Sequence, residues 1–292
     1  SALDADNEKD IIDLIMEMRK TSGLAVLWIS HDLLTALPIS DHIYVMDQGR
    51  ITASAPAAQF QNQATDSASQ ELLSAVYRPI WKQSDQTMPL LRLNNIIKKF
   101  DDKTIFEKFN LSLSLGQRLA IAGPSGCGKS TLARIIVGVE DVQGGEVVWQ
   151  DQSIKASSRV QLLFQHPALS LNPRMTIAQS LSEPFRIHKR SFSRSMLAEK
   201  LSEVQLTEDM LDRYPHQLSG GQLQRVCIAR SLVLLPQLLI LDEAVTALDA
   251  VNKVQILNLL DQMHQKYNMA MLMITHDLQL ARLFCDEVIA LS

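Results

Sequence analysis

The sequence has few cysteines and no long apolar run. Its three cysteines are odd in number and widely spaced, which indicates a reducing compartment and excludes a disulfide framework. No run reaches the roughly 18 apolar residues that a membrane-spanning helix needs, and the best candidate, residues 231–241, is too short and contains Pro236. The net charge is only −4, which argues against a protein whose main task is to coat nucleic acid.

The composition is that of a soluble globular protein. Hydrophobic residues make up 46% and charged residues 21% of the chain, which excludes disordered and collagen-like proteins. At roughly 150 residues per domain, the 292 residues suggest two domains or one large one. The chain has neither a signal peptide nor an initiator Met, so we expect it to be a piece of a longer protein.

The sequence repeats itself at a distance of 245 residues. Ser1-Ala-Leu-Asp4 aligns with Thr246-Ala-Leu-Asp249. Ile29-Ser-His-Asp-Leu33 aligns with Ile274-Thr-His-Asp-Leu278, and the apolar positions between these anchors also coincide. The period is that of a domain and not of a solenoid. We therefore expect the chain to open in the late part of one domain and to continue through a second domain of the same kind.

Several elements are predicted in the first copy. Residues 5–22 have apolar residues at helical spacing, and Gly23 is expected to end the helix. Residues 24–30 form a continuous apolar run, which is typical of a strand buried on both faces. Residues 43–52 predict two short strands around Gln48-Gly49. Because this copy lacks most of its sheet, we expect the helix and the apolar strand to be exposed.

The segment between the two copies has little apolar periodicity. Residues 53–70 are rich in Ala, Gln, Ser and Thr and are interpreted as a linker. Residues 71–78 predict a short helix, and residues 79–89 again resemble a linker. From Leu90 onward, strands and helices alternate to the end, as in a layered α/β domain.

A phosphate-binding pattern follows the short apolar strand 119–123. Gly123-Pro-Ser-Gly-Cys-Gly-Lys-Ser130 fits G-x-x-x-x-G-K-[ST], and a helix is predicted from Thr131 onward. In this pattern backbone N–H groups surround phosphate oxygens, and the positive end of the helix faces the same anion. Lys129 is expected to reach the β- and γ-phosphates and Ser130 to hold Mg²⁺. An ordinary glycine-rich turn is the alternative, but the complete pattern in this context favours nucleotide binding.

Two acids follow a second apolar strand, residues 238–241. Asp242 is suited to bind Mg²⁺ through water as the acidic partner of a phosphate loop. Glu243 is suited to polarise an attacking water as a general base. Two acids after a strand are more often a solvated turn, but Glu243 stands 114 residues after the phosphate-loop Lys129, which favours the functional interpretation.

A third motif lies between these two. Leu218-Ser-Gly-Gly-Gln222 precedes a segment with helical spacing, so Ser219 and the two glycines are expected at an anion-binding helix start. In this order the motifs resemble those of the ABC-type ATPase family, whose signature is LSGGQ.

The resemblance assigns roles to four further residues. Gln165 matches the Q-loop glutamine, which contacts Mg²⁺ and couples to the membrane partner, and Asp249 matches the D-loop. His276 matches the switch histidine that contacts the γ-phosphate. Phe100 stands 29 residues before Lys129, where the family places an aromatic residue, usually Tyr, that stacks on adenine. Alone, Gln165 and His276 would be ordinary strand-end residues and Phe100 a core residue.

ATP and Mg²⁺ are the cofactors that the resemblance implies. It implies Glu243, His276 and Lys129 as catalytic residues. It implies Ser130, Gln165 and Asp242 as the Mg²⁺ site. The residues implied to bind the nucleotide are Phe100, Gly123, Pro124, Ser125, Gly126, Cys127, Gly128, Lys129, Ser130, Thr131, Gln165, Ser219, Gly220, Gly221, Gln222 and Asp249.

The resemblance also implies a fold and a domain organisation. The fold is an α/β P-loop NTPase of the ABC type, with a central mainly parallel sheet, an antiparallel β subdomain and a helical signature subdomain. Residues 89–292 match one nearly complete domain that is truncated at its C-terminus. Residues 1–52 match the C-terminal remnant of a first domain, and residues 53–88 are a linker with a short helix. Asp4 and His31 therefore have no phosphate loop in their own copy.

Finer features resemble one importer subgroup. Ser170-Leu-Asn-Pro-Arg174 after the Q-loop, together with residues 222–226 and 242–245, is similar to the importers for peptides, nickel and opines. This implies an ATPase subunit that powers import from the cytoplasmic face of the inner membrane. The implied partners are a second ABC ATPase domain, integral membrane permease subunits and, indirectly, an extracytoplasmic solute-binding protein, with no nucleic acid. Thr246 and Ala244-Val245 depart from the commoner Ser and Pro-Thr.

Two other functions use the same motifs. One is a soluble ABC-type ATPase that acts on nucleic acid or ribosomes. The acidic balance and the Ser170–Arg174 segment argue against it, and co-purification with permeases or with ribosomes would separate the two. The other is a non-catalytic nucleotide-binding module, which the intact pair Glu243 and His276 argues against.

Overall fold

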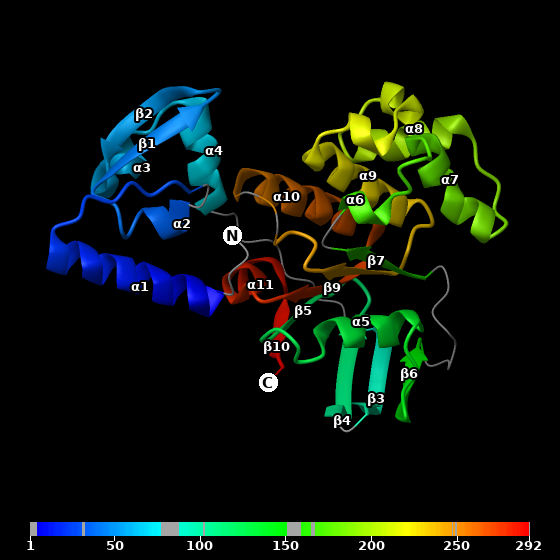
Figure 1. The fold of residues 1–292 in the computed structure, drawn as a ribbon. Helices are drawn as coiled ribbons and strands as arrows, with labels where there is room; N and C mark the ends of the chain where they lie inside the picture. The colour runs from blue at the N-terminus through cyan, green and yellow to red at the C-terminus, as the bar shows by residue number, and fades with distance from the viewer. Residues whose placement is uncertain are drawn as a thin grey trace. The chain divides into compact units, whose positions relative to one another are not determined.

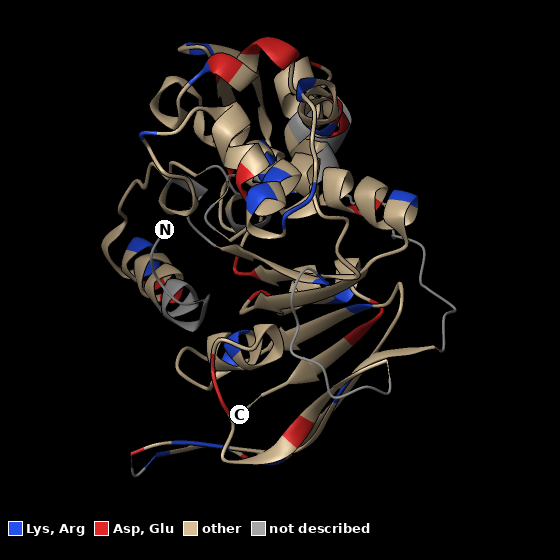
Figure 2. Ribbon diagram, turned by 90° about the vertical axis from the view of Figure 1, so that its right-hand side faces the viewer, with Lys and Arg blue, Asp and Glu red and all other residues tan. Residues whose placement is uncertain are grey.

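The structure, a computed structural model, describes residues 5–30, 33–76, 88–101, 103–150, 159–164, 167–246, 248 and 250–291. The chain divides into two compact units (Figure 1). Unit 1 comprises residues 1–80 and 248–255, and unit 2 comprises residues 81–247 and 256–292. Lys and Arg are interspersed with Asp and Glu over the described ribbon, in keeping with the small net charge (Figure 2).

Unit 2 is built on a five-stranded parallel sheet. Its strands, in order across the sheet, are β10 (Glu287–Ala290), β5 (Arg118–Ala122), β9 (Ala270–Thr275), β8 (Leu238–Asp242) and β7 (Val160–Phe164). Strands β5, β8 and β9 are buried along almost their whole length, as is typical of parallel strands covered on both faces. Since the strands run in one direction, the loops after β5, β8 and β9 leave the sheet at the same edge.

Antiparallel strands and helices surround this sheet in unit 2. The three-stranded antiparallel sheet has the order β4 (Lys103–Ser114), β3 (Pro89–Phe100) and β6 (Gly144–Trp149). The described helices are α5 (Lys129–Val137), α6 (Pro167–Ser170), α7 (Ile177–Ile187), α8 (Arg194–Glu203), α9 (Gly220–Leu232), α10 (Ala250–Tyr267), whose first residues belong to unit 1, and α11 (Leu278–Phe284). Two 3-10 turns, Glu208–Asp212 and Pro215–Gln217, connect α8 to α9. Among the described residues, no helix has both the length and the apolarity that crossing a bilayer requires.

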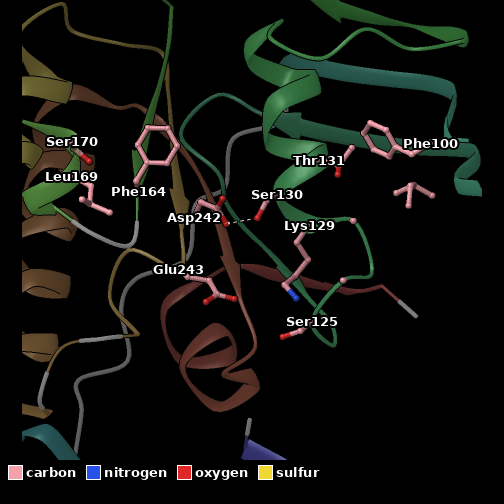
Figure 3. Close-up of a pocket in the computed structure, with 13 residues that line it drawn as sticks. Phe100, Ser125, Lys129, Ser130, Thr131, Phe164, Leu169, Ser170, Asp242 and Glu243 are labelled. Atoms are coloured by element: carbon pink, nitrogen blue, oxygen red, sulfur yellow. Dashed lines mark hydrogen bonds between the residues drawn. The ribbon is translucent and has the colours of Figure 1, made fainter. Parts of the chain in front are cut away.

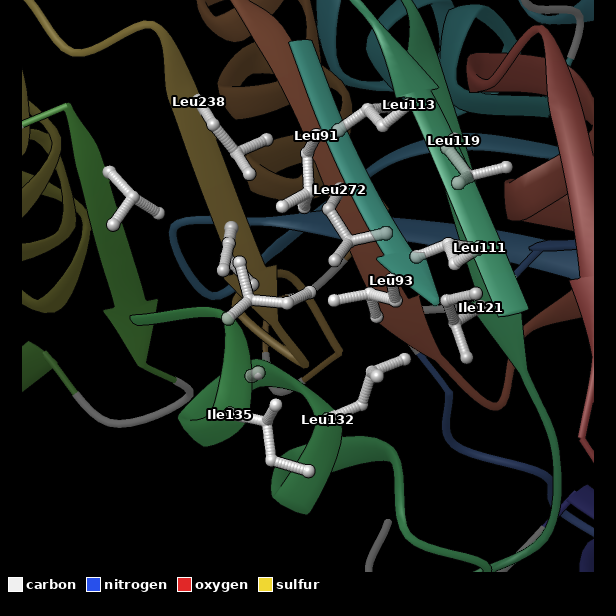
Figure 4. Close-up of a cluster of buried hydrophobic side chains, with 14 of the residues drawn as sticks. Leu91, Leu93, Leu111, Leu113, Leu119, Ile121, Leu132, Ile135, Leu238 and Leu272 are labelled. Carbon is white, nitrogen blue, oxygen red and sulfur yellow. The ribbon is translucent and has the colours of Figure 1, made fainter. Parts of the chain in front are cut away.

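One apolar cluster joins the two sheets of unit 2 to α5 (Figure 4). Leu93 of β3 and Ile121 of β5 are almost completely buried in it. Leu132 and Ile135 of α5 belong to the same cluster. The helix that follows the phosphate loop is therefore anchored by side chains from both sheets, which holds its N-terminus in place at the edge of the parallel sheet.

Unit 1 contains the helix predicted over residues 5–22 and the two strands predicted over residues 43–52. Helix α1 spans Ala5–Ser22 and ends at Gly23, whose φ of +65° favours glycine. The predicted pair of strands is also confirmed: β1 (His42–Asp47) and β2 (Arg50–Pro56) are antiparallel around Gln48-Gly49. Helix α2 (Leu33–Ala36) lies between α1 and this hairpin.

The prediction of a linker over residues 53–70 is wrong. Strand β2 extends to Pro56, a 3-10 turn and α3 (Phe60–Gln63) follow, and α4 spans Ser67–Val76, starting earlier than the predicted helix 71–78. The reason is that Phe60, fully buried, joins small residues such as Ala55 and Ala64 in a core that apolar periodicity does not reveal. Asp66 accepts a hydrogen bond from the Ser69 N–H at 3.0 Å, as a helix cap does.

The strand predicted over residues 24–30 is not formed. These residues have no regular secondary structure, and Leu27 and Ile29 are 85% and 89% exposed. The repeat counterparts of residues 25–30 lie in β9 (Ala270–Thr275), which is hydrogen-bonded between β5 and β8. Among the described residues of unit 1, the only paired strands are β1 and β2, so residues 24–30 belong to no paired strand there. The predicted exposure of this segment is confirmed, while the strand conformation is wrong.

Leu27 and its repeat counterpart Leu272 provide a matched test of this difference. We expect Leu272→Ala to lower the free energy of unfolding of unit 2 by about 2–5 kcal/mol, because Leu272 is fully buried in the core cluster. We expect Leu27→Ala to change the free energy of unfolding by less than about 0.5 kcal/mol, because its side chain already lies in solvent. Denaturant titration measures both, and equal losses would contradict the exposure of residues 24–30.

Candidate active site

A cavity of about 850 Å³ lies where the phosphate loop, the acids after β8 and the end of β3 meet (Figure 3). This volume is typical of small-molecule sites. The predicted site residues that line it are Phe100, Ser125, Gly126, Gly128, Lys129, Ser130, Thr131, Asp242 and Glu243. The structure thus brings three separate sequence motifs to one place.

The phosphate loop requires glycine at two closely approached positions. At Gly128, φ is +105°, and a Cβ would lie 2.5 Å from Ile105 Cγ2. At Gly123, a Cβ would lie 2.5 Å from the Leu291 carbonyl oxygen. Helix α5 begins at Lys129, two residues before the predicted start, so its first N–H groups point toward the loop. The backbone is therefore shaped to approach an anion closely.

The Lys129 side chain is folded against the phosphate loop. It is only 6% exposed, and Nζ donates hydrogen bonds to the carbonyl oxygens of Gly123 at 2.7 Å and Pro124 at 2.8 Å. The Cys127 Sγ lies 4.0 Å from the same nitrogen. Neutral carbonyls are weaker partners for an ammonium than phosphate oxygens are. Lys129 is thus held at the cavity by two neutral carbonyl oxygens.

Ser130 and Asp242 contact each other across the cavity. The Ser130 hydroxyl donates to Asp242 Oδ1 at 3.2 Å (Figure 3). Burial raises the pKa of the Asp242 carboxyl, and the neighbouring Glu243 charge adds to this, while the bond from Ser130 opposes it. A hydroxyl and a carboxylate at this distance fit Mg²⁺, which prefers oxygen ligands and retains several waters. In the described part of the chain no group of three or more His, Cys, Asp and Glu residues could hold a metal.

Glu243 occupies a strained turn after β8. Its φ is +51°, in the left-handed region that few non-glycine residues adopt. The turn is held because the Glu243 N–H donates to the Ile274 carbonyl at 3.0 Å and Thr246 Oγ1 donates to the Glu243 carbonyl at 2.7 Å. Glu243 Oε1 lies 3.6 Å from His276 Nδ1. Strain of this kind is typical of functional sites, and here it sets the predicted base beside the predicted switch histidine.

Comparison with known proteins places this site in a family. The sequence profile of the ABC transporter family matches residues 106–246. The nickel import ATP-binding protein NikE of Shigella boydii serotype 4 is 40% identical over 207 residues, which cover 66% of this chain and 77% of that protein. The chain belongs to the ABC transporter ATP-binding proteins. The predictions of ATP as cofactor and of an ATPase subunit of an ABC transporter are thereby confirmed.

Two further similarities extend this assignment. The glutathione import ATP-binding protein GsiA of Pectobacterium atrosepticum is 31% identical over an alignment that covers 95% of this chain and 53% of that protein. The structure of CbiO1 from Clostridium perfringens, part of the ABC transporter complex CbiONQ, matches 70% of this chain and 86% of its own with a TM-score of 0.63 and 26% identity. The predicted fold class is therefore confirmed.

The signature residues of this ABC ATPase form a helix cap. Ser219 Oγ accepts from the Gln222 N–H at 3.3 Å, and Gln222 Oε1 accepts from the Ser219 N–H at 2.9 Å. The Ser219 hydroxyl can still donate its own proton, because a hydroxyl donates and accepts at once. Residues 219–222 are not among the described residues that line the cavity. The structure therefore separates the signature from the phosphate loop of its own domain.

Some site residues cannot be placed or were not predicted. Gln165, Asp249, Asp4 and His31 lie outside the described residues. Sequence reasoning missed the apolar side of the cavity, which Ile105, Phe164 and Leu169 form, and the polar Ser170 that lines the cavity with them. Phe164 and Ser170 flank the Q-loop motif, and this proximity is the signal that could have revealed them.

Sequence reasoning also missed a buried hydrogen bond, in which Gln224 Nε2 donates to the Ala244 carbonyl at 2.9 Å. This bond connects the signature helix to the turn of Glu243.

Proposed function

We propose that the chain is the ATP-hydrolysing subunit of an ABC importer and that the cavity of unit 2 is its nucleotide site. The observation that carries the proposal is the convergence of Lys129, Ser130, Asp242 and Glu243 on one cavity beside the N-terminus of α5. Lys129 would bind the β- and γ-phosphates, and residues 123–131 would surround them with backbone N–H groups. Phe100, 42% exposed at the opposite end, would stack on the adenine.

The residues after β8 and β9 would carry out the chemistry. Glu243 would accept a proton from the attacking water as general base. His276, 3.6 Å from Glu243, would hold that carboxylate and contact the γ-phosphate. Ser130 and Asp242, together with Gln165, would hold Mg²⁺, which when bound neutralises charge on the phosphate oxygens. Positioning and electrostatics would supply most of the rate enhancement.

A second ABC ATPase domain would complete the site. Residues 219–222 and Asp249 would contact ATP bound to that partner domain, because the signature does not line the cavity of its own domain. The other partners would be integral membrane permease subunits and, indirectly, an extracytoplasmic solute-binding protein. The chain would therefore be peripheral at the cytoplasmic face of the inner membrane. Nickel and glutathione import by the relatives, together with residues 170–174, support peptides, nickel or similar small solutes as cargo.

The repeat supports a tandem organisation. We infer that residues 1–52 are the C-terminal part of a first ABC ATPase domain and that residues 89–292 are most of a second. Strand β1 supports this, because its residues align with β10 at the repeat distance of 245. Residues 25–30, whose Leu27 and Ile29 are exposed here, align with the central strand β9.

One ATP per chain is the expected stoichiometry. Residues 123–130 form the only phosphate-loop pattern in the sequence, although two copies of the His-Asp-Leu motif are present. Calorimetric titration of the chain with Mg·ATP should therefore give one site. Two sites would show that the first copy binds nucleotide as well, and no binding would refute the nucleotide site itself.

A further inference from the structure

A buried lysine contacts the ring of Phe100. Lys98 stands two residues before Phe100 on β3, and its Nζ lies 4.6 Å from the centroid of that ring. Lys98 is only 4% exposed, whereas Phe100 is 42% exposed and lines the cavity. Buried lysines are rare unless they are paired. Here Nζ donates to Glu140 Oε1 at 2.6 Å and to the Asp141 carbonyl at 2.7 Å.

The loop that holds Lys98 is itself fixed at both ends. Residues 138–143 follow α5, and the Glu140 N–H donates to the Arg134 carbonyl in the last turn of that helix at 3.2 Å. At the other end, Gln143 Oε1 accepts from the Lys99 N–H and its Nε2 donates to the Lys99 carbonyl, both at 3.1 Å. The loop therefore connects the helix of the phosphate loop to the strand that carries the aromatic ring.

We propose that Lys98 is a positioning residue for the nucleotide base and acts through Phe100. The ammonium attracts one face of the ring, and the bonds to Glu140 and Asp141 fix where that ammonium lies. Phenylalanine has no hydroxyl with which to anchor itself, so this contact orients the ring before the base arrives. A ring that is already ordered loses less conformational entropy when adenine stacks on it. The inference rests on the proposed stacking of adenine on Phe100.

The test compares two probes that differ in the base. ATP and inorganic tripolyphosphate, each with Mg²⁺, both reach the phosphate loop, but only ATP reaches Phe100. We expect Lys98→Met, which keeps the aliphatic stem, to weaken ATP binding by about three- to tenfold. The affinity for tripolyphosphate should change by less than about twofold. In a Phe100→Leu background, Lys98→Met should cause no further loss of ATP affinity, because the ring through which it acts is gone.

Other variants keep the test decisive. Lys98→Met leaves Glu140 without its cation, so the pair Lys98→Met/Glu140→Gln is used if thermal unfolding shows that the single variant is unstable. An equal loss for ATP and tripolyphosphate, or a loss that persists with Phe100→Leu, would overturn the proposal in favour of a structural role in the phosphate loop. If Phe100→Leu alone leaves ATP affinity unchanged, stacking on Phe100 fails and this inference with it. If the unaltered chain binds neither probe, the nucleotide site itself fails.

Discussion

Replacing Lys129 with alanine should abolish ATP binding. Lys129 is the cation held at the phosphate loop, with its Nζ on the carbonyl oxygens of Gly123 and Pro124. Those carbonyls can be exchanged for phosphate oxygens, which form stronger, charge-assisted hydrogen bonds. The loop itself should keep its shape, because Gly128 and the buried residues of α5 determine its path. Equilibrium titration with Mg·ATP measures the loss.

Lys20→Ala is the matched control for this loss. Lys20 is exposed on α1 and is not among the residues that line the cavity, so its removal changes the net charge equally and leaves the lining intact. We expect its ATP affinity to match that of the unaltered chain. If the affinity of Lys129→Ala also stays within about threefold of the unaltered chain, Lys129 does not bind the phosphates and the assignment of the phosphate loop is wrong.

Glu243→Gln should slow ATP hydrolysis by about a hundredfold or more while ATP affinity stays nearly unchanged. The amide has the shape of the carboxylate and can still face His276, but it cannot accept a proton from water. The backbone of the turn, with its bond to the Ile274 carbonyl, should be retained. Phosphate release is measured on the chain assembled with a second ABC ATPase domain, and affinity by titration of the same preparation.

A glutamate outside the cavity serves as the control. Glu208 lies in the 3-10 turn after α8, where it forms an exposed ion pair with Arg194. The turnover of Glu208→Gln should stay within about twofold of that of the unaltered chain. Glu208 does not line the cavity, and the loss of an exposed ion pair costs little stability. Undiminished turnover of Glu243→Gln would exclude Glu243 as the base and would direct attention to another proton acceptor.

The phosphate loop and the acids could be predicted because each depends on local sequence. In residues 123–130 the spacing of glycines, Lys and Ser alone specifies a turn that binds phosphate. Asp242 and Glu243 are recognisable because they end a buried strand. The phosphate loop and these acids meet at one cavity because β5, β9 and β8 are neighbouring parallel strands, an order that a layered α/β pattern makes predictable.

The role of Lys98 depends on contacts that sequence spacing does not contain. Its partner Glu140 lies 42 residues away and reaches it because the loop after α5 folds back on β3. The apolar side of the cavity has the same origin, since Phe164 and Leu169 come from separate elements of the chain. Contacts of this kind are decided by tertiary packing, which local patterns do not encode.

Two sequence predictions for unit 1, the strand over residues 24–30 and the linker over residues 53–70, are wrong for opposite reasons. Residues 24–30 have the composition of a central strand, but a strand needs neighbouring strands, and among the described residues of unit 1 only β1 and β2 pair, with each other. Residues 53–70 have the composition of a linker, yet Phe60 and two alanines of this segment pack into a small core with Leu33, Ile43, Val45 and Leu73. Composition therefore predicted too much regular structure for residues 24–30 and too little for residues 53–70.

The exposed residues 24–30 have a consequence for handling the protein. The segment Leu24-Ala-Val-Leu-Trp-Ile-Ser30 carries no charge, proline or glycine, and its Leu27 and Ile29 side chains lie in solvent. Short segments of this composition readily pair with identical segments of other molecules and stack into cross-β aggregates. We therefore expect the same residues that would complete the centre of a folded sheet to promote self-association of this chain as its concentration rises.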